Sequence, residues 1–103
     1  MTPTEVFNPY GFGYGNNVSV SSTSASITLA DNVAKESPNI LVSNELSETV
    51  FLRWGSGTQT AVTTDVPVAA GTTQVFFKGN AQVIAVVSTT GTGTVRIYPG
   101  KGI

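Results

Sequence analysis

The chain has 103 residues, of which 40% are hydrophobic and 11% are charged, and its formal net charge is −1. That length supplies one domain with one core, and the few basic residues are too scattered to form a patch that binds nucleic acid. The chain contains no histidine and no cysteine, which removes disulfides, thiolate metal sites and the side chain most used as a general base. We therefore expect no enzyme, no cofactor and no metal site.

No apolar run approaches the roughly 20 residues that a membrane helix requires, and the first residues lack the basic and apolar regions of a signal peptide. We expect no membrane partner and a chain that is made in a cytoplasm and stays soluble. Weakly charged, β-rich chains associate easily unless their edges are covered. We interpret association as the purpose of this composition.

Residues 1–17 differ from the rest and are predicted to form an arm, with a single domain over residues 18–103. Four of the nine aromatic residues lie in this arm and alternate with glycine and proline: Phe7, Tyr10, Phe12 and Tyr14. The glycines disfavour a stable helix or strand, yet four rings left in water would form a sizeable apolar patch. The rings are therefore expected to pack either on the chain's own domain or on a neighbouring subunit. We predict all four to be partner-binding residues.

Two short runs of alternating apolar residues follow the arm. Val18 and Val20 are separated by one polar residue, as are Ile27 and Leu29, and this is the period of a half-buried strand. The hydroxyl-rich residues 22–24 between the runs suit a turn. The two runs are therefore predicted to pair as a hairpin.

The middle of the chain is predicted to hold strands over residues 40–42 and 49–54, after a charged surface loop over 31–38 with at most one helical turn. Alternation in the second strand directs three side chains to the core: Val50, Leu52 and Trp54. Trp54 is interpreted as a core anchor, because large aromatic side chains are usually buried.

The second half of the chain reads as a series of short strands. They are expected over residues 59–63, 65–68, 73–77, 83–87 and 94–98, followed by a short tail over 99–103. Pro67 can be accepted only in an edge strand or at the end of a strand. The run 83–87 is apolar on both faces and is typical of a central strand or one covered by a partner. Val95 and Ile97 are expected to face the core. The pattern predicts an all-β fold, an antiparallel, jelly-roll-like β-sandwich with an extended N-terminal arm, or a small barrel.

The six carboxylates show no pattern of a catalytic or metal site. They lack the regular spacing of a calcium loop, and nothing in the sequence indicates the paired carboxylates of a glycosidase. Aromatic residues on a sandwich suggest an alternative, a carbohydrate-binding module in which Tyr10, Tyr14 or Trp54 stacks on a sugar. The polar partners that such a site also needs do not accompany the arm.

Part of the chain resembles a known group of proteins. The stretches that carry the resemblance are 40–44, 50–55, 63–71, 75–77 and 94–102. They are similar to small virion proteins encoded near the head genes of tailed bacteriophages. The resemblance implies a homodimer or homotrimer that binds the major capsid protein on the outside of the capsid, as a decoration or cement protein, after synthesis in the host cytoplasm. A tail or neck component is the alternative, and no catalytic residue comes with the resemblance.

Overall fold

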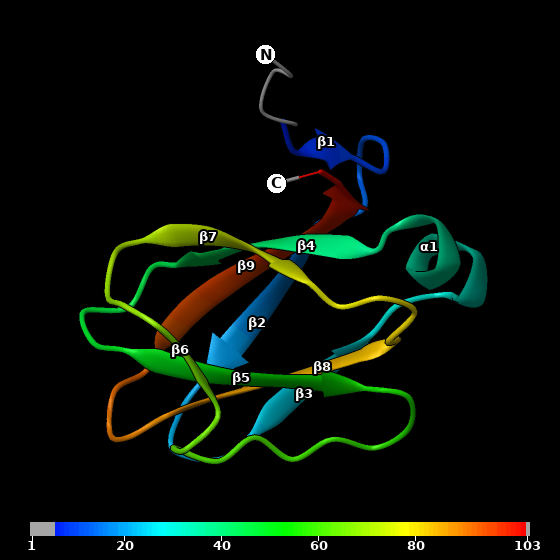
Figure 1. Cartoon of the computed structure of the whole chain (residues 1–103). Helices are drawn as coiled ribbons and strands as arrows, with labels where there is room; N and C mark the ends of the chain where they lie inside the picture. The colour runs from blue at the N-terminus through cyan, green and yellow to red at the C-terminus, as the bar shows by residue number, and fades with distance from the viewer. Residues whose placement is uncertain (1–5, 103) are drawn as a thin grey trace.

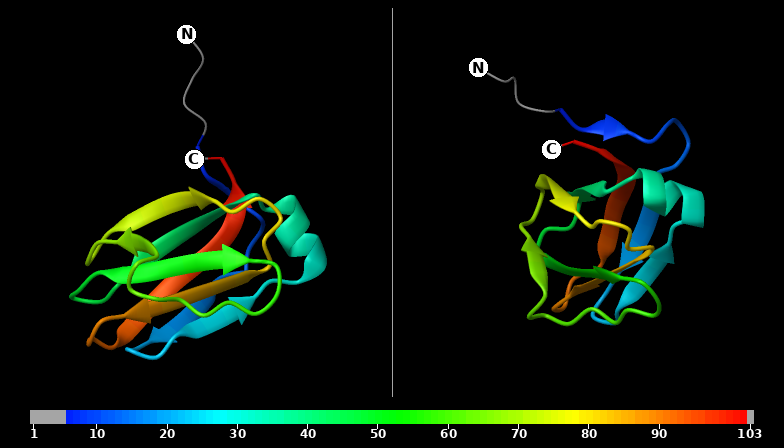
Figure 2. Two further views of the ribbon diagram at one scale, coloured as in Figure 1. Left: turned by 60° about the horizontal axis from the view of Figure 1, so that its bottom comes forward. Right: turned by 45° about the vertical axis from the view of Figure 1, so that its right-hand side comes forward.

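A computed structural model describes residues 6–102 of the chain. Two antiparallel β-sheets pack face to face, and one short helix lies at the side of the sandwich (Figure 1). The first and the last strand of the chain lie side by side at one end of the molecule (Figure 2). The arm is therefore placed beside the end of the sandwich to which the chain also returns last.

We call the two sheets A and B. Sheet A contains β1 (Asn8–Pro9), β2 (Asn16–Val20), β4 (Asn39–Asn44), β7 (Thr73–Phe77) and β9 (Gly93–Lys101). Sheet B contains β3 (Ala25–Thr28), β5 (Val50–Gly55), β6 (Val66–Val68) and β8 (Val83–Ser88). The helix is α1 (Asp31–Glu36).

The strand order defines the fold. Sheet A has the order β2-β9-β4-β7, with β1 pairing to the far end of the β9 edge that β2 also uses. Sheet B has the order β3-β8-β5-β6. Eight strands in two such sheets form a jelly roll. The predicted all-β, antiparallel, jelly-roll-like sandwich with an N-terminal arm is confirmed.

The core lies between the sheets, where every second side chain of each strand points inward. Its fully buried members include four that the alternation predicts: Val50, Leu52, Val95 and Ile97. Each such side chain contributes about 1.5–3 kcal/mol on burial. Trp54 is half-buried at the margin of this core, and its ring packs against Phe76 with the centroids 5.5 Å apart.

The predicted hairpin over the two runs after the arm is wrong. β2 pairs with β9 in sheet A, whereas β3 pairs with β8 in sheet B. The chain therefore crosses from one sheet to the other between these strands. Both strands direct alternate apolar residues into one core from opposite sides, so the crossing produces the same period of two as a hairpin.

Three other local predictions also differ from the structure. Residues 59–63 form no strand and belong to a loop, and residues 99–101 continue β9 instead of forming a tail. The expected surface loop contains α1, which exceeds one turn because it buries Val33 and Ala34 against the sandwich. Of the two positions expected for Pro67, the structure shows an edge strand, β6. No helix among residues 6–102 is long and apolar enough to cross a membrane.

β8 is buried on both faces, as its apolar run predicts, and lies between β3 and β5. Its inner face joins the core, and its outer face is covered by the loop over residues 56–65 between β5 and β6. Ala61 of this loop packs on Ala85 and Val87, with Phe51 beside them. The chain itself, and not a partner, covers this side of sheet B.

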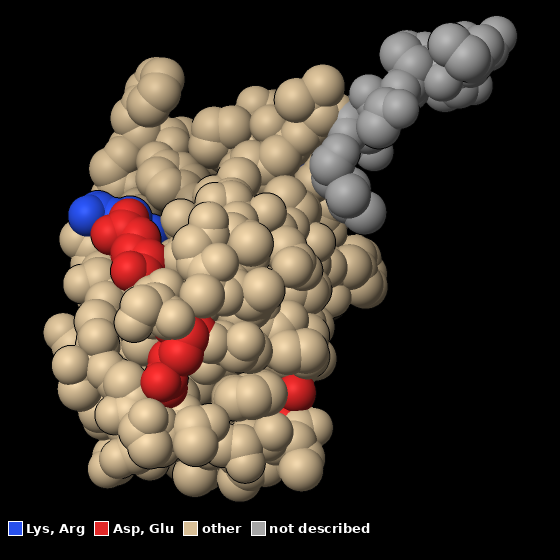
Figure 3. Space-filling model, turned by 90° about the vertical axis from the view of Figure 1, so that its left-hand side faces the viewer, with Lys and Arg blue, Asp and Glu red and all other residues tan. Residues whose placement is uncertain are grey.

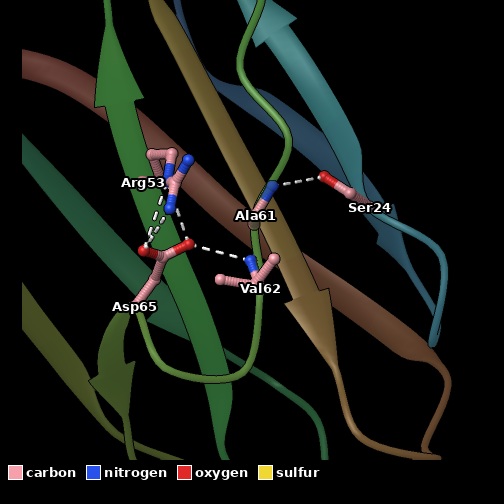
Figure 4. A network of polar contacts seen from close by, with 5 residues as sticks. All are labelled: Ser24, Arg53, Ala61, Val62 and Asp65. Carbon is pink, nitrogen blue, oxygen red and sulfur yellow. Dashed lines mark hydrogen bonds and ion pairs between the residues drawn. The ribbon is translucent and has the colours of Figure 1, made fainter.

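Polar contacts fix the 56–65 loop in place (Figure 4). The Ala61 N–H donates to Ser24 Oγ at 2.9 Å, and the Val62 N–H donates to Asp65 Oδ2 at 2.8 Å. Asp65 also accepts bonds of 3.0 to 3.2 Å from the Arg53 guanidinium. The pKa of the Asp65 carboxyl is lowered mainly by the hydrogen bond from the Val62 N–H and, to a smaller extent, by Arg53. The loop is thereby anchored to β5 and to the segment before β3.

Candidate interaction surface

The arm folds back on the chain's own sandwich and extends sheet A. β1 runs antiparallel to the end of β9, and the Tyr10 N–H donates to the Pro99 carbonyl at 2.9 Å. Gly100 permits this close approach, because a Cβ there would lie 2.4 Å from the Asn8 carbonyl oxygen and 2.6 Å from Cζ of Phe7. Glycine inside a strand is typical of a place where another segment passes closely.

Tyr98 on the outer face of sheet A ties down the turn between β1 and β2. Its hydroxyl donates to the Gly11 carbonyl and accepts from the Tyr14 N–H at 3.3 Å. Gly13 at the turn has φ +84°, a conformation that only glycine adopts freely. The rings of Tyr10 and Tyr14 meet edge to face, with centroids 4.7 Å apart. The turn is thus held by several contacts to itself and to the sheet.

The four predicted partner-binding residues take different positions. Phe7 and Tyr10 are half-buried against the end of the sandwich, and Tyr14 retains 43% of its surface. Phe12 is 96% exposed. The structure therefore packs part of the arm on its own domain and leaves one ring almost entirely in water. The partner-binding role of the four residues, like the division of the chain at residue 17, stays a prediction.

The exposed ring borders an apolar groove. The groove is lined by Phe7, Pro9, Phe12, Leu41 and Tyr98. Leu41 stands beside Tyr98 on one side and Val75 on the other in the register of sheet A. Phe77, which is 68% exposed, lies two residues after Val75 and therefore on the same face of the sheet. We call this set of seven residues the aromatic face. Its strand members come from four strands, β1, β4, β7 and β9, and those of the last three have no local sequence signal.

Few charges surround the aromatic face. Arg96, on the outer face of sheet A, forms an exposed ion pair with Glu45, and Glu36 and Lys101 line a small hollow beside Tyr10. Burial, and second the nearby Glu36 charge, raise the pKa of Tyr10. Figure 3 shows that one end of the molecule is also mostly uncharged, with a few acidic and basic side chains on it. Electrostatic repulsion between two such surfaces is weak.

Glu48, like Asp65, is engaged by backbone N–H groups of turns. The Glu48 carboxylate accepts the Gly91 and Thr90 N–H groups at 2.8 and 3.1 Å, and these bonds lower its pKa. It therefore ties the turn after β4 to the turn after β8. Within the described part of the chain, no group of three or more acidic side chains is placed to hold a metal ion.

The residues suggested for sugar stacking are not brought together. Tyr10 and Tyr14 pack on each other in the arm, whereas Trp54 lies on β5 of the other sheet and packs at the core. No shared flat platform is formed by the three rings.

The fold and this surface define a jelly-roll sandwich with an exposed apolar face. The sequence matches no protein-family model and no curated protein. Solved structures with a similar fold include a protein of the disulfide-linked pili that are Bacillus endospore appendages, with 18% identity over 97% of this chain and 89% of that chain, and a TM-score of 0.48. The crystal structure of PirA is also similar, with 16% identity over 87% of this chain and 96% of that chain, and a TM-score of 0.52.

These comparisons overturn the resemblance to phage virion proteins. The similar structures reported above are an endospore appendage protein and PirA, neither is named as a capsid decoration protein, and at these identities the likeness concerns the fold alone. The texture of short strands and turns that suggested the resemblance is common to jelly rolls in general and carries no functional motif. The assignments that depended on it are wrong, namely capsid cement, a tail or neck component, the major capsid protein as partner, and a virion location.

Proposed function

We propose that this chain is a non-enzymatic structural subunit that associates with copies of itself. The association does not use disulfide links such as those named for the endospore appendages, because the chain contains no cysteine. The aromatic face is the observation that supports this class of function.

The aromatic face leaves large apolar side chains in contact with water. Phe12 and Phe77 together leave most of two aromatic side chains in water, next to the half-buried Leu41 and Tyr98. Larger apolar patches on soluble proteins mark interaction surfaces or liabilities for aggregation. The arm is anchored by backbone and hydroxyl bonds that keep Phe12 exposed, which favours an interaction surface over an unfolded tail.

The chemistry of the side chains supports a role without catalysis. Asp65 and Glu48 are occupied by backbone N–H groups of turns, and the sequence holds neither histidine nor cysteine. General acid–base and nucleophilic catalysis require a positioned reactive group with a tuned pKa. The carboxyl groups here have lowered pKa values, which suit permanent acceptors.

Sedimentation velocity of the full chain over about 1 to 100 µM tests the proposal. We expect the weight-average mass to rise with concentration towards a whole multiple of the single-chain mass. A single-chain mass over the whole range, with the chain folded by circular dichroism, contradicts self-association.

A further inference from the structure

We infer that two copies of this chain pair about a two-fold axis through the aromatic face, with Phe12 of each copy seated in the groove of the other. The inference rests on the proposed function and specifies its surface and symmetry. The surface consists of Phe7, Pro9, Phe12, Leu41, Tyr98, Val75 and Phe77.

Phe12 is held in place before any partner arrives. The turn that carries it is fixed on one side by the Tyr10 N–H to the Pro99 carbonyl and on the other by the Tyr14 N–H to the Tyr98 hydroxyl. A side chain on an anchored turn loses less freedom on binding than one on a loose arm. An aromatic side chain presented in this way has the properties of an interface anchor.

The groove suits an aromatic ring. Its walls are the rings of Phe7, Phe12 and Tyr98, together with Pro9 and the aliphatic side chain of Leu41. The Tyr98 hydroxyl, which is the polar group among these side chains, already donates to the Gly11 carbonyl and accepts from the arm. An entering ring therefore leaves no polar group of the walls without a partner, which is the condition for favourable apolar burial.

The projecting ring and the groove lie on the same surface of one chain. A two-fold interface requires such self-complementarity, because each surface patch meets its own copy. A head-to-tail contact would need the ring and the groove on different sides. The arrangement therefore favours a closed pair of copies of this chain over an open chain of copies.

The charges around the surface fit this occupant, and its exposed rings supply part of the area that a stable pair buries. A standard interface takes about 800 Å² from each partner, and Phe12 and Phe77, at 96% and 68% exposure, supply roughly 300 Å² of it. The remainder falls to the other members and to the polar rim. That rim contains both signs of charge, with Arg96 paired to Glu45 and with Lys101 near Glu36. Two identical rims can therefore meet without facing like charges throughout.

The experiment compares Phe12→Ser and Leu41→Ser with the control Val62→Ser by sedimentation equilibrium of the full chain. Val62 is 44% exposed on the 56–65 loop of sheet B, away from the aromatic face. We expect wild type and Val62→Ser to form a dimer with the same dissociation constant, and each of the other two substitutions to raise that constant by about tenfold or more. Circular dichroism verifies that each variant is folded.

The possible failures are distinguishable. A dimer or larger oligomer that both Phe12→Ser and Leu41→Ser leave unchanged overturns the two-fold pairing but retains the proposed self-association. A wild-type chain that stays single overturns both. Because Phe12 makes no contribution to the core, the Phe12→Ser result does not depend on a residue that the fold needs.

Discussion

The outer faces of the two sheets are covered in opposite ways. On sheet B, the 56–65 loop seals Ala85 and Val87 beneath Ala61 and is fastened by Ser24 and Asp65. On sheet A, the arm crosses only one end of the face and leaves Phe12 exposed beside Leu41. Both covers are segments without long regular structure, yet one completes the fold and the other creates a surface.

The difference shows how one fold separates stability from recognition. The loop of sheet B buries Ala85 and Val87 and has no aromatic ring projecting from it, and its exposed apolar residue, Val62, is a single side chain of moderate size. The arm of sheet A presents rings on a fixed turn, which the core does not need. Substitutions on the two faces should therefore change different properties, namely unfolding on sheet B and association on sheet A.

The largest expected contrast comes from placing the same charge on both faces. Val87→Asp buries a carboxylate at a position that is 5% exposed, and should lower the free energy of unfolding by at least about 3 kcal/mol. Phe12→Asp should change it by less than about 0.5 kcal/mol. Urea unfolding of dilute protein measures the free energy of unfolding of both variants. Equal losses would contradict the difference between the two faces.

Gly100→Ala tests how the arm is attached. The new Cβ would collide with the Asn8 carbonyl, so the arm should detach from β9 at a cost of about 1–3 kcal/mol. Hydrogen exchange of the Tyr10 amide should then become fast. Lys101→Ala, on the exposed neighbour in β9, is the matched control and should leave the amide protected. Continued protection in Gly100→Ala would mean that the arm does not depend on this approach.

Asp65→Asn tests how the loop of sheet B is fastened. The substitution weakens the bonds to Arg53 and to the Val62 N–H, and should cost about 1–2 kcal/mol at neutral pH. The folded state lowers the pKa of this carboxyl. The stability that the ionised Asp65 contributes is therefore present above its ordinary pKa near 4 and is lost as the pH falls through its lowered pKa in the folded state. Thermal unfolding from pH 7 downwards should therefore show a shallower decline in the variant than in wild type. Parallel declines in the thermal stability of the variant and the wild type would show that ionised Asp65 does not stabilise the fold.

The smallest effect is expected at the rim of sheet A. Arg96→Ala removes an ion pair with Glu45 in which both side chains are about half exposed. Exposed pairs of this kind contribute less than about 1 kcal/mol, so the free energy of unfolding should change by no more than about 0.5 kcal/mol. A larger loss by urea unfolding would show that this rim also stabilises the fold.

The sequence predicts the strands better than their partners. Alternation identifies the inward side chains of β5 and β9 because a half-buried strand repeats every two residues. The same alternation in β2 and β3 cannot distinguish a hairpin from a crossing between sheets, since both bury one face in the same core. The 59–63 segment resembles a strand because Ala61 is apolar, but that residue covers sheet B from outside.

Only part of the aromatic face can be predicted from the sequence. The arm rings stand out by composition, whereas Leu41 and Tyr98 look like ordinary strand residues, and the topology alone places them under the arm. Gly100 is the one signal that could have been used, because glycine within a strand often indicates a close approach of backbone. Its partner, the Asn8 carbonyl, lies at the other end of the chain and cannot be found by local pattern.

Disulfide trapping can show whether two copies pair through the aromatic face, because the natural chain contains no cysteine that would form a competing disulfide. Chains carrying Phe12→Cys and chains carrying Leu41→Cys are mixed and oxidised, with Val62→Cys in place of Leu41→Cys as the control. We expect the first mixture to form a covalent dimer faster than the control mixture does. Equal, slow cross-linking in both mixtures would contradict pairing through the aromatic face.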